Sequence, residues 1–323
     1  MLPKLLVQHN TLSTRAVLLD DHGVLRRFSY NIADTQTPIV GDVYCVRAVA
    51  PMSGGNGWFV GLLDNSSAMI RNPGNDIAVG DKILAQVSRI TDKGYSMARH
   101  IRLYGRYISL TYNTSARLFS QNIEDDAIAP EAIANETQAL HARLDQFMEA
   151  YPRAKPPLCL YSANDVISKL LQLAPLHCDI HVDDPHLAQQ LQTHIDHAYP
   201  DLQGRVYPHP AFRDLLGEHG ADCVYEELCA PHRSLSCGGR IHIDATHAAT
   251  CFDIDQADSH HVSKTNRNAL QEIARIIALR EYGGVMIIDP IHQEQRGYLL
   301  RLLQNMSDAC ITFNVPLKAL HIT

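Results

Sequence analysis

The sequence predicts an all-β module followed by an α/β region, and three observations support this fold class. Short apolar strands separated by Gly, Asn, Pro and Asp recur through the first hundred residues, as in a small β-barrel. From about residue 156 onward, strand-like and helical segments alternate. In the C-terminal third, two apolar runs of strand length end on aspartate with a helical stretch between them, which indicates a mixed sheet with a helical crossover.

The β-rich module is expected to cover residues 1–110. Apolar segments on either side of the turn Asp20–Gly23 predict a hairpin. Five further strands are expected at 42–47, 58–62, 68–70, 82–87 and 96–100. This count fits a five-stranded OB-like barrel over about residues 38–102.

Such barrels bind single-stranded nucleic acid with exposed aromatic rings on a strand face and basic side chains on the loops. Phe59, Lys93 and Arg99 have suitable types and places for these contacts. For any one aromatic side chain, burial in the barrel core is the commoner role.

The α/β region is expected after a polar connection and helix at 111–155. The helix is predicted at Glu131–Ala150, with prolines soon after it. Strands at 158–161, 179–182 and 204–207, with helical segments near 163–174 and 184–198, predict an α/β subdomain over 156–237. A second α/β subdomain is expected over 238–323.

Three carboxylates end the two apolar runs of this last subdomain. Asp253 and Asp255 end one run, and Asp289 ends the other. Apolar positions between residues 259 and 281 follow a helical period, and Gly283-Gly284 stop the helix before the second run. If the two strands pair side by side, the carboxylates meet at one edge of the sheet, where oxygen ligands can hold Mg²⁺.

Strand-terminal aspartates also commonly cap the loop or helix that follows. From the pattern alone this structural role is favoured, because capping and ion-pair networks also occupy and perturb acids. The chemical interpretation depends on a cation, since clustered carboxylates repel one another unless one neutralises them. Bound Mg²⁺ would then activate water and offset charge on a phosphoryl group.

Composition narrows the class of protein. No apolar stretch reaches the length of a membrane span, and the N-terminus is too short in its apolar part for a signal peptide, so we expect a cytoplasmic protein without a membrane partner. Eight cysteines lack any Cys-x-x-Cys pair, which predicts free thiols. Residues 1–120 carry 13 Lys and Arg against 8 Asp and Glu, while residues 121–323 carry 15 against 27. This segregation suits nucleic-acid binding by the first part, although chance would produce it about as often.

A string of ordered motifs in the last subdomain resembles the catalytic core of the ribonuclease E/G family. The motifs are Gly238–Thr246, Asp253–Asp255, Lys264–Asn266, Glu272–Arg275 and Gly283–Asp289. In the N-terminal part, Ile39–Tyr44, Trp58–Val60, Asp92–Gly94 and Gly105–Tyr107 are similar to that family's S1-type barrel and its flanks. The resemblance covers roughly residues 1–110 and 156–305, and it includes an RNase H-like subdomain.

The resemblance implies an endoribonuclease that cleaves single-stranded RNA and leaves a 5′-phosphate. Mg²⁺ would be held by Asp253 and Asp289, with Asp255 as a third catalytic candidate where the family usually has asparagine. Phe59 matches the family's stacking aromatic and Lys93 a basic RNA contact.

Departures from the family leave an alternative open, a catalytically inactive RNA-binding protein. Met69 stands where a second aromatic is usual, and His292 where a second acid often follows Asp289. The segment that forms the family's 5′-monophosphate sensor has no counterpart between Asn113 and Glu136. The paired-cysteine zinc link is not found before Thr323, so a zinc-linked dimer is not expected, while another homo-oligomer stays open.

Overall fold

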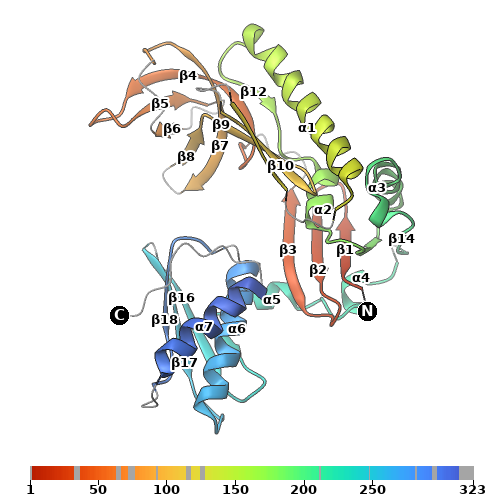
Figure 1. The fold of residues 1–323 in the computed structure, drawn as a ribbon, viewed down its shortest axis with the longest axis vertical. Coiled ribbons are helices and arrows are strands. Elements are labelled where there is room, and N and C mark those ends of the chain that lie inside the picture. The colour runs from red at the N-terminus through yellow and green to blue at the C-terminus, as the bar shows by residue number, and fades with distance from the viewer. Residues whose placement is uncertain are drawn as a thin grey trace. The chain divides into compact units, whose positions relative to one another are not determined.

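The computed structural model describes residues 2–312, except 33–36, 63–66, 72–76, 92–93, 114–117, 124–127, 211, 247, 281 and 293–296. The chain forms two compact units (Figure 1). The barrel unit comprises Leu2–Ala16 and Tyr30–Ala211, and the C-terminal unit comprises Val17–Ser29 and Phe212–Thr323 together with Met1. None of the helices within the described ranges combines the length and apolar character that crossing a bilayer would need.

Five strands of the barrel unit close into a barrel. They are β4 (Val43–Pro51), β5 (Gly57–Gly61), β6 (Ser67–Arg71), β7 (Lys82–Thr91) and β8 (Gly94–Ala98). They pair in the order β4-β5-β6-β8-β7, and β7 pairs back to β4. Apolar side chains such as Val46 and Ile70 fill the interior. All five strands were expected from the sequence, and the closed barrel is consistent with an OB-like module.

A strand from beyond the barrel extends its sheet. β12 (Leu158–Tyr161) pairs antiparallel with β4, although the sequence grouped it with the α/β strands that follow. The helix α1 (Pro130–Ala150) and the short η1 (Tyr151–Arg153) precede β12. Lys82 at the start of β7 donates hydrogen bonds of 2.9 Å to the carbonyls of Tyr151 and Pro152, which fixes the end of this helical segment on the barrel.

Next to the barrel strands, β9 (His100–Tyr104), β10 (Ile108–Asn113) and β11 (Leu118–Ile123) form a three-stranded antiparallel sheet. Part of this sheet occupies the stretch that we expected to be a polar connection. Burial of Ile108, Leu110 and Tyr112 shows why β10 forms, because these apolar side chains, at every second position, pack inward.

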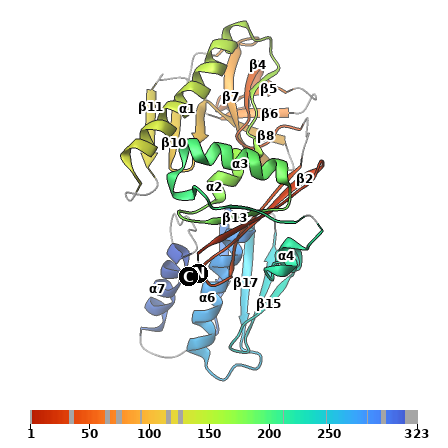
Figure 2. The same ribbon diagram turned by 90° about the vertical axis from the view of Figure 1, so that its right-hand side faces the viewer.

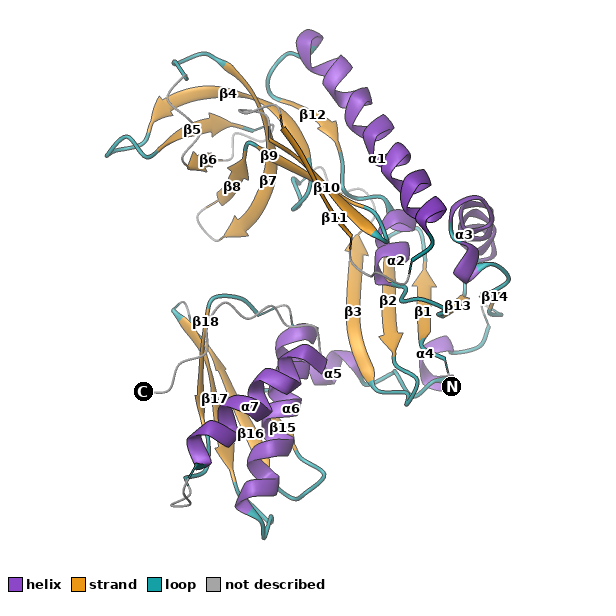
Figure 3. Cartoon of the chain, in the orientation of Figure 1, coloured by secondary structure: helices purple, strands orange, loops and turns teal. Residues whose placement is uncertain are grey.

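The first strands of the chain belong to a separate five-stranded sheet, ordered β14-β13-β1-β2-β3. Its strands are β1 (Lys4–His9), β2 (Ser13–Leu19), β3 (Leu25–Ile32), β13 (Asp179–Val182) and β14 (Val206–Pro208). β1 runs parallel to β13, although the sequence analysis placed the first strand in the β-rich module of residues 1–110 and not beside an α/β strand. The associated helices are α2 (Val166–Leu173), α3 (Pro185–Ala198) and η2 (Pro200–Leu202), and Figure 3 shows α2 and α3 near the strands.

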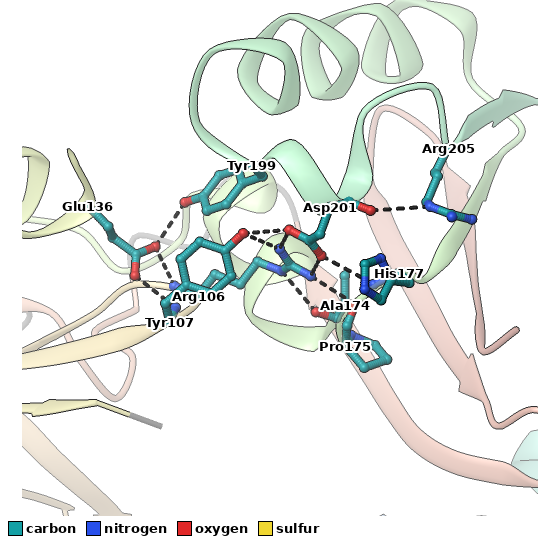
Figure 4. Close-up of polar contacts among 9 residues, drawn as sticks. All are labelled: Arg106, Tyr107, Glu136, Ala174, Pro175, His177, Tyr199, Asp201 and Arg205. Atoms are coloured by element: carbon teal, nitrogen blue, oxygen red, sulfur yellow. Dashed lines mark hydrogen bonds and ion pairs between the residues drawn. The ribbon is translucent and has the colours of Figure 1, made fainter. Parts of the chain in front are cut away.

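A buried polar network explains the Gly105–Tyr107 motif (Figure 4). The Glu136 carboxylate accepts hydrogen bonds from the backbone N–H groups of Arg106, Tyr107 and Ile108 at 2.7–2.9 Å. A side chain at Gly105 would place its Cβ 2.3 Å from the carboxyl carbon of Glu136, so any larger residue would displace this carboxylate. The position therefore needs glycine for packing within the barrel unit.

The Arg106 side chain ties this network to a second carboxylate. Its guanidinium is almost fully buried and forms two hydrogen bonds with Asp201, at 2.6 and 2.7 Å. Burial alone would raise the pKa of Asp201, but the hydrogen bonds from Arg106 and Tyr107 outweigh it and lower the pKa to about 2.

The C-terminal unit contains a four-stranded sheet ordered β15-β16-β17-β18. Its strands are β15 (His232–Ser234), β16 (Arg240–Ala245), β17 (Ala249–Asp255) and β18 (Val285–Asp289), and its helices are α4 (Leu215–Glu218), α5 (Val224–Cys229), α6 (Val262–Leu279) and α7 (Tyr298–Thr312). β17 and β18 are parallel and joined through α6, as the sequence predicts. Figure 2 shows α6 alongside β17, and residues of α6 and α7 pack on the buried face of the sheet.

Candidate metal centre

Two aspartates lie side by side on neighbouring parallel strands. In the β17–β18 ladder, Phe252 pairs with Ile288, and Asp253 pairs with Asp289. Neighbouring strands are about 4.8 Å apart, and residues paired in a ladder point to the same face of the sheet. The structure therefore brings the two aspartates that the sequence singled out to one place on one face.

The alternation of buried and exposed side chains along β17 shows on which face of the sheet the two aspartates lie. Phe252 and Ile254 are buried against α6, so Asp253 and Asp255 point away from the helices. Asp253, Asp255 and Asp289 are all exposed. We call this side, defined by residues 240, 242 and 244 of β16, 251, 253 and 255 of β17 and 287 and 289 of β18, the open face.

The carboxylates of Asp253 and Asp289 are not used as caps. Among the described residues, neither carboxylate takes part in a hydrogen bond or ion pair. The capping interpretation fits Asp255 instead, because its Oδ1 accepts a hydrogen bond from the N–H of Ala257 at 3.1 Å. Ala257 has φ 42, which is left-handed backbone, and this bond holds the turn that follows β17.

Two histidines lie in line with Asp253 and Asp289 across the sheet, and the sequence analysis did not predict them. His242 on β16 pairs with Asp253, and His232 on β15 pairs with His242. The two imidazole ring centroids are 6.5 Å apart. The signal was present in the alternation of Arg240–Asp244, which places residues 240, 242 and 244 on one face.

The packing of Gly239 against Thr265 explains why the motifs Gly238–Thr246 and Lys264–Asn266 occur together. A Cβ at Gly239 would lie 2.5 Å from the Thr265 side chain, and Gly238 has φ +92. The turn between β15 and β16 thus packs directly on the first turns of α6. The Thr265 hydroxyl also contacts the hydroxyl of Ser259 at 2.5 Å, which joins α6 to the loop after β17.

Asn266 supports the end of β18. Its amide nitrogen donates to the carbonyl of Ile291 at 2.8 Å, and its oxygen accepts from the N–H of Ile291 at 3.1 Å. Tyr298 also donates its hydroxyl to the Ile291 carbonyl. Because Asn266 is buried, these bonds fix the chain two residues beyond Asp289.

Glu272 and Arg275 hold the hairpin to the helix on the other side of the sheet. Glu272 accepts from Arg233 at 3.0 Å and from Arg275 at 2.6 Å. Arg275 also donates to the carbonyl of Leu25 at 3.2 Å. These contacts are structural, and they explain the Glu272–Arg275 motif without placing it at the carboxylates.

The donor set of the open face fits a hard cation. Two exposed carboxylates can supply oxygen ligands, and Mg²⁺ commonly takes one or two carboxylates and completes its shell with water and phosphate oxygens. No group of three or more His, Cys, Asp and Glu residues in the described part of the chain is arranged to hold a metal. Mg²⁺ would thus depend on Asp253 and Asp289 together.

The candidate RNA-binding residues are placed differently. Phe59 on β5 is 40% exposed, and it pairs with Met69 on β6. Lys93 lies outside the described residues. Arg99 directly follows β8 and is half-buried. Burial raises the pKa of Tyr151, and the positive charge of Arg99 acts against this shift.

Residues that pair in the barrel sheet continue from Phe59 across strands β6, β8 and β7. Met69 pairs with Ser96 on β8, and Ser96 pairs with Arg89 on β7. An exposed ring and an exposed guanidinium therefore lie on one row, and the sequence reading missed Arg89.

Comparison with known proteins assigns the chain to a family. The sequence model described as the ribonuclease E/G family matches residues 103–323, more than half of the chain, and the chain belongs to this family. Ribonuclease E of Haemophilus influenzae is 25% identical over 254 residues, which is 66% of this chain and 27% of that protein.

Other relatives are similarly distant. Ribonuclease E of Escherichia coli is 26% identical over 65% of this chain and 24% of its own length. Ribonuclease G of Salmonella typhimurium is 21% identical over 96% of this chain and 75% of its own length. The chain thus spans only about a quarter of the length of these two ribonucleases E.

Proposed function

We propose that the protein is a Mg²⁺-dependent endoribonuclease that cleaves single-stranded RNA, with Asp253 and Asp289 as the metal ligands of its active site. The observation that carries the proposal is the register of β17 and β18, which sets the two aspartates directly beside one another on the open face. Family membership supports the choice of RNA as substrate, because the matched relatives are named as ribonucleases.

In this proposal Asp253 and Asp289 would hold one Mg²⁺ where the scissile phosphate binds. Bound Mg²⁺ would lower the pKa of a coordinated water and offset the charge that develops on the phosphoryl oxygens. Hydrolysis adds the water across the P–O3′ bond and leaves a 5′-phosphate on one product and a 3′-hydroxyl on the other. The β17–β18 ladder fixes the backbone at Asp253 and Asp289, and the bonds from Asn266 to Ile291 fix the chain just after Asp289.

The barrel supplies RNA binding in the same proposal. The exposed ring of Phe59 can stack on a base, and Arg89 and Lys93 can neutralise phosphates. The excess of basic residues in positions 1–120 supports this role. Met69 beside Phe59 offers a smaller apolar surface in place of a second ring.

Cleavage of an unstructured RNA by the purified chain tests the proposal. Asp253→Asn and Asp289→Asn should each lower kcat/KM by about 100-fold or more, since each removes a charged ligand. Asp244→Asn is the matched control, because Asp244 is an exposed carboxylate on the same face that pairs with Cys251. RNA binding that survives both substitutions, with no cleavage by the wild type at any Mg²⁺ concentration, would instead favour a non-catalytic RNA-binding protein.

A further inference from the structure

A second exposed surface of the barrel unit lies on β9, outside the closed barrel. The residues of this strand alternate between exposed and buried. Ile101 and Leu103 pack into the core, whereas His100, Arg102 and Tyr104 are exposed, the last with 47% of its surface accessible. We call these three residues the β9 surface. It combines an aromatic ring with positive charge on one side of a strand.

Recorded contacts hold the β9 surface in place. A terminal guanidinium nitrogen of Arg102 donates to the Tyr104 hydroxyl at 3.3 Å, so the charge and the ring lie side by side. The Gln172 side chain donates to the Tyr104 carbonyl at 2.9 Å. Buried Gln86 of β7 accepts from the Arg102 N–H at 2.8 Å and donates to the Arg102 carbonyl at 2.9 Å, which fastens β9 to the barrel. The surface is therefore preorganised for a ligand.

The charge around this surface favours an anionic ligand. Residues 94–123, which span β8 to β11, contain neither Asp nor Glu, and they contain arginines at 99, 102, 106 and 117. Of these, Arg106 is paired with the buried side of Asp201 and contributes no net charge. The β10 residues that pair with the β9 surface are the uncharged Ser109, Thr111 and Asn113. An anion at β9 therefore meets no carboxylate from β9 or β10.

We propose that the β9 surface is a second binding site for single-stranded RNA, in which the Tyr104 ring stacks on a base and Arg102 binds an adjacent phosphate. The inference rests on the proposed function in taking single-stranded RNA as the ligand. A ring beside a guanidinium suits this ligand, because every nucleotide of an unpaired strand offers both a base face and a phosphate.

The β9 surface is close enough to the barrel residues for one RNA strand to contact both. Gln86, which fastens β9, and the exposed Arg89 are three residues apart on β7, or about 10 Å along the strand. Through the sheet pairing, Arg89 belongs to the row of residues that begins at Phe59. OB-type barrels cover about 4–16 nucleotides of single strand, which is longer than this spacing. The two surfaces can therefore share one ligand.

Fluorescence anisotropy with a 5′-hydroxyl oligouridine of about 12 nucleotides, in EDTA to prevent cleavage, tests the β9 surface. Tyr104→Ala should weaken binding about tenfold, because one stacked base is lost. Tyr104→Phe keeps the ring and should bind almost as the wild type does. Tyr30→Ala is the matched control and should change nothing, because Tyr30 is 49% exposed on β3 of the same unit.

The salt dependence of binding tests Arg102 separately. Each phosphate contact on a single strand contributes about 0.7 to the slope of log affinity against log salt, so Arg102→Gln should lower the slope by about this amount. Arg213→Gln should leave the slope unchanged, because Arg213 is an exposed arginine of the C-terminal unit that is paired with Glu218. Urea unfolding should show these variants to be as stable as the wild type, since the substituted side chains are exposed.

Three outcomes would contradict the inference, and they differ in meaning. If Phe59→Ala weakens RNA binding and Tyr104→Ala does not, the β9 surface takes no part in binding and the proposed function stands. If 5′-phosphorylated RNA binds more tightly than 5′-hydroxyl RNA and Arg102→Gln removes the difference, the surface binds a chain end and not internal nucleotides. If the wild type binds no single-stranded RNA, the proposed function fails together with this inference.

Discussion

At the scale of single residues, the buried Glu136 site has a structural role. Glu136 collects three backbone N–H groups and the hydroxyl of Tyr199, and Gly105 is the residue that lets its carboxylate approach. Buried carboxylates of this kind persist only when their hydrogen bonds are complete. The Gly105–Tyr107 motif is therefore explained by packing, with no appeal to RNA.

Gly105→Ala should lower the free energy of unfolding by about 1–3 kcal/mol, because the added Cβ overlaps the Glu136 carboxylate. Urea unfolding measures the loss. Gly283→Ala is the control, since a Cβ there meets no neighbour within 4 Å. Equal stability of the two variants would mean that the Glu136 site adapts at no cost.

The depressed pKa of Asp201 predicts acid sensitivity of the barrel unit. The carboxyl pKa is about 2 in the folded chain and about 3.9 when unfolded, so the stabilisation is complete above about pH 5 and is lost progressively as the pH falls to about 1. The loss amounts to about 2–3 kcal/mol.

Unfolding by urea at pH 5 and at pH 3 should show part of this decrease in the wild type. Asp201→Asn should be less stable at pH 5, because it leaves the Arg106 guanidinium buried without its carboxylate, and it should show a smaller decrease between the two pH values. An unchanged decrease in that variant would assign the acid sensitivity to other groups.

At the scale of elements, the strand β5 carries the main RNA prediction. Phe59→Ala should weaken binding of single-stranded RNA by about 1–3 kcal/mol, the usual loss for one stacked base. Fluorescence anisotropy at fixed salt measures it. Val49→Ala on β4 is the control, because Val49 is a large exposed apolar residue of the same barrel. If both variants bind RNA equally well, Phe59 is not a stacking platform.

Elements with strong local signals were predictable from the sequence. The apolar runs of β17 and β18, with the helical period of α6 between them, predicted both the crossover and the meeting of Asp253 with Asp289. Pairing partners of short strands were less predictable. β12 pairs with β4 and β1 with β13, and these choices depend on contacts between segments more than a hundred residues apart, which no local pattern encodes.

The same distinction applies to the open face. Asp253 and Asp289 end apolar runs and could be found by inspection. Arg240 and His242 sit inside the β16 strand, where alternation shows which face they occupy but not which residue lies opposite. The separate behaviour of Asp255 also needed the structure, because only the bond to Ala257 distinguishes it from its neighbours.

At the scale of the whole molecule, the chain is a member of the ribonuclease E/G family in which a closed barrel and a sheet with paired aspartates are both present. The excess of basic residues falls in the part that contains the barrel, and the acidic excess falls in the part that contains the open face. In the proposed function, the first part would hold an RNA strand and the second part would hold a cation.

The central claim is that Asp253 and Asp289 hold one cation between them. Titration of Mn²⁺ into the wild type, the two single Asp→Asn variants and the double variant tests it most directly. One Mn²⁺ should bind the wild type, each single substitution should remove most of the affinity, and the double substitution should do little more. Independent binding, in which each single variant keeps its own ion and the two losses add, would contradict the claim.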